Sequence, residues 1–176
     1  MATPVKLVPL SPYDGQTGLM VPFVLERIKK AALDWSGEMD PIQLVARIGQ
    51  RVYSCDPSIR LLAFVGGTGK LVGHAVASME TDGINTWVFV SQVKMDPGDW
   101  GDAIPRGLEE ADKWAEWYSE AVLVPNGHKP ISEMLMATSR EDRGFIRRYG
   151  FKTYRHIMSR PVNHKGAKAE GSGATT

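Results

Sequence analysis

Two short stretches decide the fold of this chain: Met95-Asp96-Pro97-Gly98-Asp99-Trp100-Gly101-Asp102-Ala103-Ile104 and Tyr149-Gly150-Phe151. The first lies between a run with strand-like alternation and a run with helical spacing, so it predicts a turn from a strand into a helix. The second ends a basic helix predicted over 141–149 and opens a strand predicted over 152–161, because glycine readily adopts the conformation that ends a helix. Two such steps, about forty residues apart, indicate a layered fold of helices and strands.

The composition is that of one globular domain, which we expect to span residues 1–161. With 176 residues and 43% hydrophobic content, the chain is large enough to bury a core. Lys+Arg of 21 against Asp+Glu of 20 gives a net charge of +1, so no overall field directs the protein to nucleic acid or to an anionic membrane. Residues 162–176 are small and polar and predict a flexible polar tail.

The cysteine usage and the N-terminus predict a soluble cytoplasmic protein. Cys55 is the only cysteine, which excludes an internal disulfide and a cysteine-based zinc site and is typical of a reducing compartment. Residues 1–11 carry one lysine and no long apolar run, and no stretch approaches about 18 apolar residues. Neither a secretory signal nor a membrane span is therefore expected.

The first elements are a strand and two amphipathic helices. Weak alternation predicts a strand over 5–10, and apolar residues at helical spacing predict a helix from Pro22. Asp40 directly before Pro41 is typical of a capped start, so a second helix follows.

Three consecutive strands are predicted over 61–65, 71–79 and 86–95, joined by hairpin turns at 66–69 and 82–83. In the third of these strands we expect a single face to carry Trp87, Phe89, Ser91, Val93 and Met95.

A helix is predicted over 104–118, a loop over 122–130 and a short buried strand over 134–138, before the basic helix and the final strand. Together the elements predict an α+β fold with one mixed, mostly antiparallel sheet flanked by helices. No internal repeat is visible.

The order and spacing of these elements resemble the GNAT superfamily of N-acetyltransferases over residues 5–161. Val5-Lys6-Leu7-Val8-Pro9-Leu10 is similar to that family's opening strand, and Phe145-Ile146-Arg147-Arg148-Tyr149-Gly150-Phe151 is similar to its closing helix and Gly-Phe step. The resemblance implies a GNAT-like sheet and an acyl-coenzyme A site. In the family, a Gln/Arg-x-x-Gly-x-Gly/Ala turn before the third helix offers backbone N–H groups to the pyrophosphate of coenzyme A.

The turn of this chain departs from the family pattern at Trp100, Ala103 and Pro105. Tryptophan lacks the planar cation, alanine adds a Cβ where the backbone must approach the phosphate, and proline has no N–H to donate. Asp99 and Asp102 add negative charge beside the turn. We therefore expect the turn to begin a helix but to bind a pyrophosphate poorly.

If the chain binds acetyl-CoA, the resemblance implies that the pantetheine arm enters between the strand over 86–95 and the fifth strand. The cofactor-binding residues that it implies are Val90, Ser91, Val93, Trp100, Gly101, Ala103 and Ile104.

The proton-transfer residues of the family are also altered. The tyrosine that commonly protonates the departing thiolate falls on Ile146, which cannot donate a proton. His74 and Glu133 are the remaining candidates for a general base, because an imidazole or a carboxylate can accept a proton. Tyr149 is the remaining candidate for an acid. The alternative interpretations are a hydrogen-bonded histidine on a sheet face for His74 and a packing residue for Tyr149.

Positive charge gathers in the C-terminal part of the sequence, at Arg140, Arg143, Arg147, Arg148, Arg155 and Arg160. This segment is either a solvated face or a docking surface for an acidic partner or a nucleic acid backbone. No aromatic residues of the base-stacking kind accompany it, so nucleic acid is the less expected partner. No metal site is predicted, because the histidines are scattered.

Two functional hypotheses follow. The first is an acetyltransferase-fold protein with a degenerate acyl-CoA site that binds another protein or a larger assembly. It resembles the acetyltransferase-like proteins of bacteriophages, some of which are virion components, and this implies a virion-associated location. The second is an active acetyl-CoA-dependent N-acetyltransferase, in which a primary amine attacks the thioester and His74 or Glu133 removes its proton.

Overall fold

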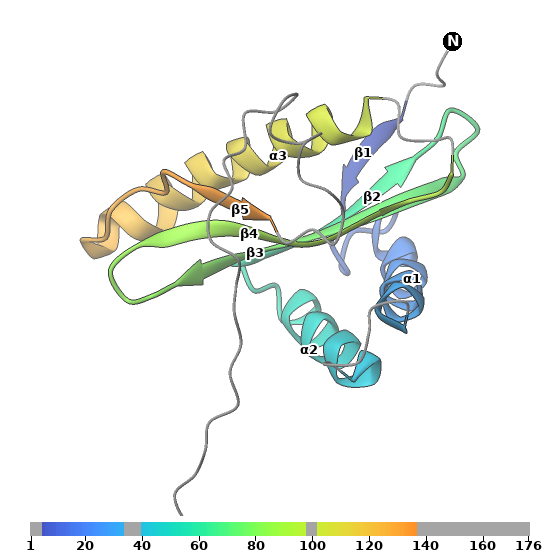
Figure 1. Cartoon of the computed structure of the whole chain (residues 1–176), viewed down its shortest axis with the longest axis horizontal. Helices are drawn as coiled ribbons and strands as arrows, with labels where there is room; N and C mark the ends of the chain where they lie inside the picture. The colour runs from blue at the N-terminus through green and yellow to red at the C-terminus, as the bar shows by residue number, and fades with distance from the viewer. Residues whose placement is uncertain (1–4, 34–39, 98–101, 137–176) are drawn as a thin grey trace, which may run out of the picture. The chain divides into compact units, whose positions relative to one another are not determined.

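The computed structural model describes residues 5–33, 40–97 and 102–136 (Figure 1). The chain divides into two compact units, residues 1–139 and 140–176, and the described residues all belong to the first. The predicted helix over 141–149, the strand over 152–161 and the tail over 162–176 lie outside the described residues. The predicted domain boundary at residue 161 therefore stays a prediction.

The described unit is a five-stranded mixed sheet between helices, which confirms the predicted α+β class. The strand order is β1-β2-β3-β4-β5, with antiparallel pairing from β1 to β4 and parallel pairing of β5 with β4. Within the described ranges, no helix is long and apolar enough to cross a membrane. The elements follow in the order β1 (Lys6–Pro9), a 3₁₀ turn (Gly18–Met20), α1 (Val21–Leu33), α2 (Pro41–Tyr53), β2 (Ile59–Val65), β3 (Leu71–Thr81), β4 (Thr86–Met95), α3 (Ala103–Tyr118), a π-helical turn (Ser119–Leu123), a second 3₁₀ turn (Val124–Asn126) and β5 (Met134–Met136).

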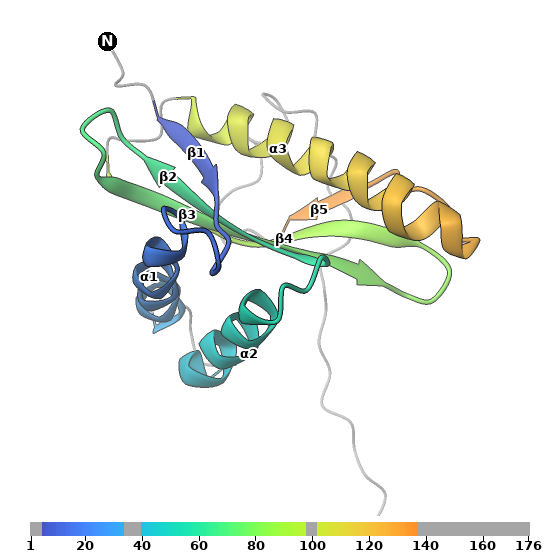
Figure 2. The same cartoon turned by 180° about the vertical axis from the view of Figure 1, so that it is seen from behind.

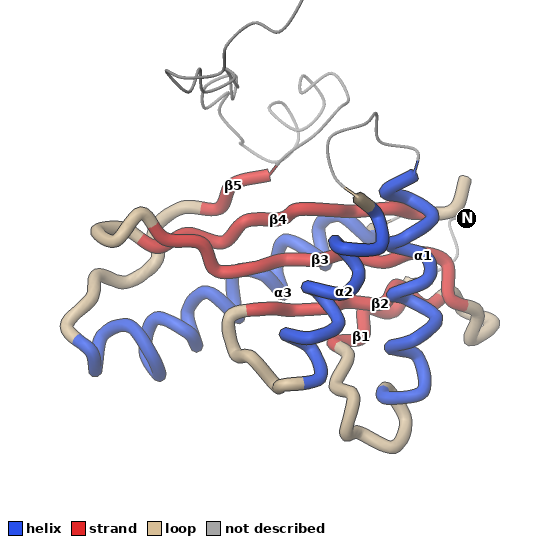
Figure 3. Tube along the Cα trace, turned by 90° about the horizontal axis from the view of Figure 1, so that it is seen from below, coloured by secondary structure: helices blue, strands red, loops and turns tan. Residues whose placement is uncertain are grey.

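Helices cover both faces of the sheet. α1 and α2 lie side by side on one face and α3 crosses the other (Figures 1 and 2), and the view from below places α1 and α2 in front of the strands (Figure 3). On the first face, Val24 and Ile28 of α1 are fully buried against Leu61 and Val76. On the second, Trp114 of α3 packs in a cluster with β3 and β4. Both faces are thus removed from water, which stabilises the sheet through apolar burial.

The predicted start of α2 is confirmed. Asp40 is the N-cap, its Oδ1 accepts a hydrogen bond from the N–H of Ile42 (2.9 Å), and Pro41 occupies the first turn. The carboxylate satisfies one of the N–H groups that have no partner within the helix, and proline at this position removes another.

The predicted single face of β4 is wrong, because the strand contains a β-bulge at Ser91. Ala77 pairs with Val90 and the next residue back along β3, Val76, pairs with Gln92, so Ser91 has no opposite residue. The extra residue reverses the alternation of side chains. Val88 and Val90 therefore face α3 before the bulge, and Val93 and Met95 face it after the bulge.

The predicted loop over 122–130 is partly helical. After α3 the chain continues through the π-helical turn and the second 3₁₀ turn, and the helical run ends at Gly127 with φ of 78°. Pro125 lies in the first turn of a helical segment, where its missing N–H has no partner to lose. Here proline begins a short helical segment and glycine ends it, so neither residue excludes a helix.

β1 is an edge strand of the described sheet and ends in Pro9. The N–H of Leu10 donates to the carbonyl of Leu61 (2.9 Å), toward β2. Because successive N–H groups of a strand point to opposite sides, the nitrogen of Pro9 points to the open edge.

Replacing Gly73 in β3 by alanine should destabilise the protein. A Cβ at this position would meet Sδ of Met95 and would lie 2.7 Å from the carbonyl oxygen of Lys94. Since the backbone oxygen cannot move freely, we expect a loss of about 1–3 kcal/mol in the free energy of unfolding, measured by urea denaturation. Gly15→Ala is the control, because nothing lies within 4 Å of its Cβ. Equal stability of the two variants would contradict the packing at Gly73.

Candidate functional site

The turn from β4 to α3 begins at an ion pair with α1. Nη2 of Arg27 lies 2.6 Å from Oδ1 of Asp96, and both side chains are about two-thirds buried or more. The N–H of Asp96 also donates to the carbonyl of Val72 in β3 (2.8 Å). Sequence reasoning missed this pair, because its members are 69 residues apart. Arg27, a cation beside the entry to the turn, is therefore already neutralised.

The start of α3 holds a second ion pair. Asp102 is the N-cap but makes no side-chain capping bond; its Oδ2 instead accepts from Nε of Arg106 (2.6 Å). Pro105 occupies the third helical position, so at most three of the usual four free N–H groups remain. A carboxylate at the N-terminus of a helix occupies the place where the helix dipole attracts an anion. The start of α3 therefore carries a paired carboxylate and one N–H donor fewer than usual.

The predicted cofactor residues lie on two elements. Val90, Ser91 and Val93 belong to β4, while Ala103 and Ile104 open α3. Ala103 is only 1% exposed and packs in the core with Val5 and Phe64, among others. Trp100 and Gly101 lie outside the described residues, so their contribution stays a prediction.

The described pairing of β5 leaves the second half of β4 open on that side. β5 pairs with β4 only through Val88, Phe89 and Val90. Ser91 follows directly, and its Oγ donates to the carbonyl of Val76 (3.3 Å). Within the described ranges, the backbone beyond the bulge thus has no strand partner on the β5 side. The entry of a pantetheine arm here stays a prediction.

His74 is completely buried in β3 and forms a polar pair with Gln92. The Nε2–H group of His74 donates to Oε1 of Gln92 (2.8 Å), and Nδ1 has no partner among the described groups. Burial lowers the pKa of His74 from 6.5 to about 4; the hydrogen bond to Gln92 raises it, while the positive charge of Arg27 lowers it. Lys94 lowers the pKa further and Asp96 raises it.

This geometry matches the alternative interpretation of His74, a hydrogen-bonded histidine in the sheet. With a pKa of about 4 it is neutral near pH 7 but a weak base. His74 is the single polar residue of the otherwise apolar run 71–77, whereas Gln92 lies beside Ser91 and near Lys94 in β4, so only His74 stands out in the sequence. The bulge at Ser91 turns Gln92 toward the face that carries His74.

The structure does not bring together His74 and Glu133, the two predicted catalytic residues that it describes. Glu133 is exposed beside the start of β5, on the side of α3, and its backbone carbonyl accepts from the N–H of Val88 (3.2 Å). His74 lies on the opposite face of the sheet, in line with Ala63 beneath α1 and α2. Tyr149 lies outside the described residues. The catalytic roles of all three residues stay predictions.

No protein-family model matches the sequence, and no curated protein matches it. Solved structures do match. A predicted acetyltransferase from Clostridium acetobutylicum, crystallised with acetyl-CoA, has a TM-score of 0.62 at 11% identity. The match covers 92% of this chain and 100% of that chain. The chain has the N-acetyltransferase fold.

Two further structures with this fold are similar to the chain. Aminoglycoside 6′-N-acetyltransferase from Acinetobacter baumannii has a TM-score of 0.59 at 14% identity, with 92% of this chain and 99% of that chain covered. Glucosamine-6-phosphate N-acetyltransferase from Arabidopsis thaliana has a TM-score of 0.56 at 13% identity, with 91% and 99% covered. At these identities the likeness establishes the fold, and the chemistry must be argued from the residues of this chain.

His74 should make the stability of the protein depend on pH between about 4 and 6.5. In that window the unfolded chain binds a proton that the folded chain excludes, so stability falls as the pH falls. The full shift corresponds to about 3 kcal/mol. The measurement is urea denaturation at pH 7.5 and at pH 4.5, and His74→Gln is the comparison because glutamine does not titrate. Equal pH dependence in the two proteins would show that His74 is not the group responsible.

Proposed function

We propose that this acetyltransferase-fold chain binds another protein or a larger assembly and does not catalyse acetyl transfer. Its acyl-CoA site is degenerate in this proposal. The observation that carries it is the first turn of α3, where Asp102 is paired with Arg106 and Pro105 removes an N–H donor. A pyrophosphate there would meet a carboxylate in place of a free cation.

The state of the candidate base supports the same proposal. An acceptor amine must lose a proton during acetyl transfer, and a base must reach that proton within hydrogen-bond distance. His74 is 0% exposed and already donates to Gln92. Glu133 is accessible, but it lies on the other side of the sheet from His74.

Exposed apolar side chains on the layer formed by α1 and α2 support a binding role. Leu19, in the 3₁₀ turn before α1, and Phe23, four residues further on, are 73% and 69% exposed, and Ile42 at the start of α2 is 66% exposed. Leu19 and Phe23, which are close in the chain, are large exposed apolar groups of the kind that protein interfaces use. A structural component of a bacteriophage particle is one such role, and that part of the proposal rests on the sequence resemblance alone.

Titration calorimetry of the full chain with acetyl-CoA tests the proposal. We expect no saturable binding up to millimolar ligand, because the turn lacks a free cation. Asp102→Asn should leave Arg106 unpaired and bring weak binding into the measurable range, whereas Glu109→Gln, further along the exposed side of α3, should have no effect.

The opposite result is equally clear. Micromolar affinity of the unmodified chain for acetyl-CoA, strengthened further by Trp100→Arg, would contradict a degenerate site. Release of the coenzyme A thiol with a primary amine as acceptor would then establish an active N-acetyltransferase.

A further inference from the structure

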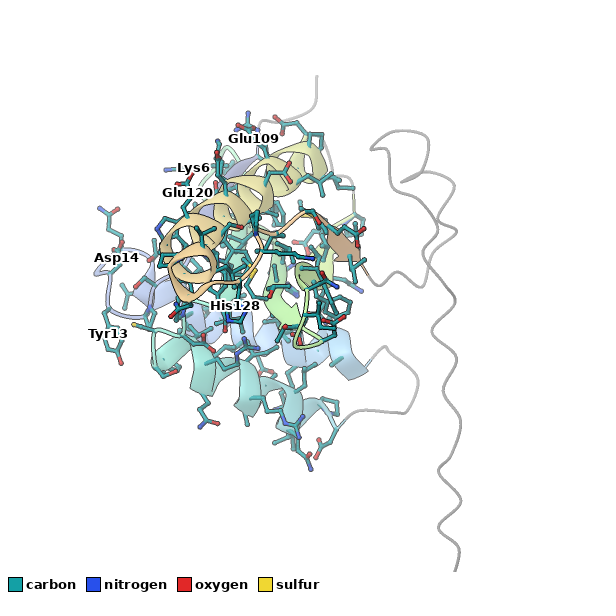
Figure 4. All side chains as sticks on the ribbon, turned by 90° about the vertical axis from the view of Figure 1, so that its left-hand side faces the viewer. Lys6, Tyr13, Asp14, Glu109, Glu120 and His128 are labelled. Atoms are coloured by element: carbon teal, nitrogen blue, oxygen red, sulfur yellow. The ribbon has the colours of Figure 1, made fainter. Side chains whose placement is uncertain are left out.

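Arg60, the second residue of β2, contacts two tryptophan rings of α3. Its Cζ atom lies 5.7 Å from the ring centroid of Trp114 and 5.7 Å from that of Trp117. Both distances are within the reach of a cation–π contact, about 6 Å. The two tryptophans are three residues apart in the last turns of α3, so they share one face of the helix. Figure 4 views the molecule from this end of α3, with Glu120 labelled.

The alternation of β2 places Arg60 on the α3 side of the sheet. Leu61 packs in the core beneath α1 and α2, whereas Leu62 packs in a cluster with Ala103 of α3. Side chains two residues apart in a strand share a face, so Arg60 points to the same side as Leu62. The register of β1 with β2 ends at the pair of Pro9 and Leu62. Arg60 therefore lies beyond the end of β1, at the border of the sheet, and is partly exposed.

This contact offers hydrogen-bond donors and lacks an acceptor. Arg27, Arg51 and Arg106 each have a carboxylate partner, but Arg60 has neither an ion pair nor a hydrogen bond within the described ranges. Its guanidinium carries five N–H donors in one plane. Nε1 of Trp114, which is only 4% exposed, also has no acceptor among the described groups. Two neighbouring side chains thus have the same unmet requirement, an oxygen that accepts.

The rings hold the guanidinium in place before any ligand arrives. Trp114 is buried, while Trp117 is 45% exposed and packs edge to face with Tyr118, with the ring centroids 6.3 Å apart. A long side chain that is already ordered loses less conformational entropy when it binds. Tryptophan and arginine are also the residues in which binding energy is most often concentrated at protein interfaces.

We propose that Arg60 and Trp117 form a docking point for an acidic side chain of a partner protein. The guanidinium binds the carboxylate through two parallel N–H···O bonds, and the exposed part of Trp117 packs on an apolar neighbour of the acidic residue. Glu116 and Glu120 add negative charge to this end of α3, which opposes a doubly charged phosphate more than a singly charged carboxylate. The inference specifies the partner of the proposed binding role and rests on that proposal.

Side-chain NMR of the full chain with ¹⁵N-labelled arginine and tryptophan tests the docking point. The probe is N-acetyl-glutamyl-leucinamide, and its glutaminyl counterpart is the matched control ligand. We expect the glutamyl peptide alone to shift the Nε–H signal of Arg60 saturably, with a Kd in the millimolar range, on the order of what one such contact supplies.

Substitutions separate the two parts of the docking point. Arg60→Lys retains the charge but not the planar fork, so affinity measured from the indole signal of Trp117 should fall at least about fivefold. Trp117→Ala should weaken binding measured at Arg60, and Trp117→Phe should restore part of it because a ring is present again. Arg47→Gln is the control, since Arg47 is an exposed arginine of α2, on the other face of the sheet. Circular dichroism verifies that each variant is folded.

Four results would each overturn the docking point. They are no saturable shift of the Arg60 signal, an equal response to the glutaminyl peptide, an equal loss of affinity in Arg47→Gln, and tighter binding of inorganic phosphate than of the glutamyl peptide at Arg60. The acetyl-CoA titration reports on the other end of α3, so a failure here leaves its outcome unchanged and the two proposals can fail separately.

Discussion

The bulge at Ser91 is the constraint on which the rest of the sheet depends. β4 must offer apolar side chains to α3 along its whole length, yet a regular alternation would turn Gln92 and Lys94 toward that helix. One extra residue reverses the alternation, so Val88 and Val90 meet one part of α3 and Val93 and Met95 meet the other. The same reversal turns Gln92 to the opposite face, where it becomes the partner of His74. The bulge thus gives α3 a continuous apolar surface to pack on, and on the opposite face it gives Nε2 of His74 a hydrogen-bond partner.

Much of the fold could be predicted from the sequence, because helix and strand periodicities are local. The bounds of β4 and the cap of α2 are examples. The reversal of faces in β4 has a signal in the sequence, because the buried apolar positions shift from 88 and 90 to 93 and 95. The prediction missed it because it assumed regular alternation along the whole strand. The segment after α3 was missed for another reason: proline and glycine are compatible with the first and last positions of a helical turn, and local composition does not distinguish these from a loop.

The candidate site was less predictable, because its electrostatics depend on contacts between distant segments. The substitutions at Ala103 and Pro105 are visible in the sequence, and the pairing of Asp102 with Arg106 follows from helical spacing. No local pattern indicates that Arg27 neutralises Asp96, since only the packing of α1 on the sheet brings them together. The burial of His74 likewise follows from the layer above it and not from its neighbours in the chain. These contacts decide whether the turn and the sheet offer free charge to a ligand.

The proline at the end of β1 limits how this protein can associate. An open sheet edge is a template for strand addition, through which identical chains can polymerise into fibrils. Pro9 removes an N–H from that edge, and β1 is only four residues long, so few backbone groups are left to form an intermolecular ladder. Copies of this chain held at high local concentration are consequently protected from aggregation along β1. Contacts through side chains of the helical layers remain open to them.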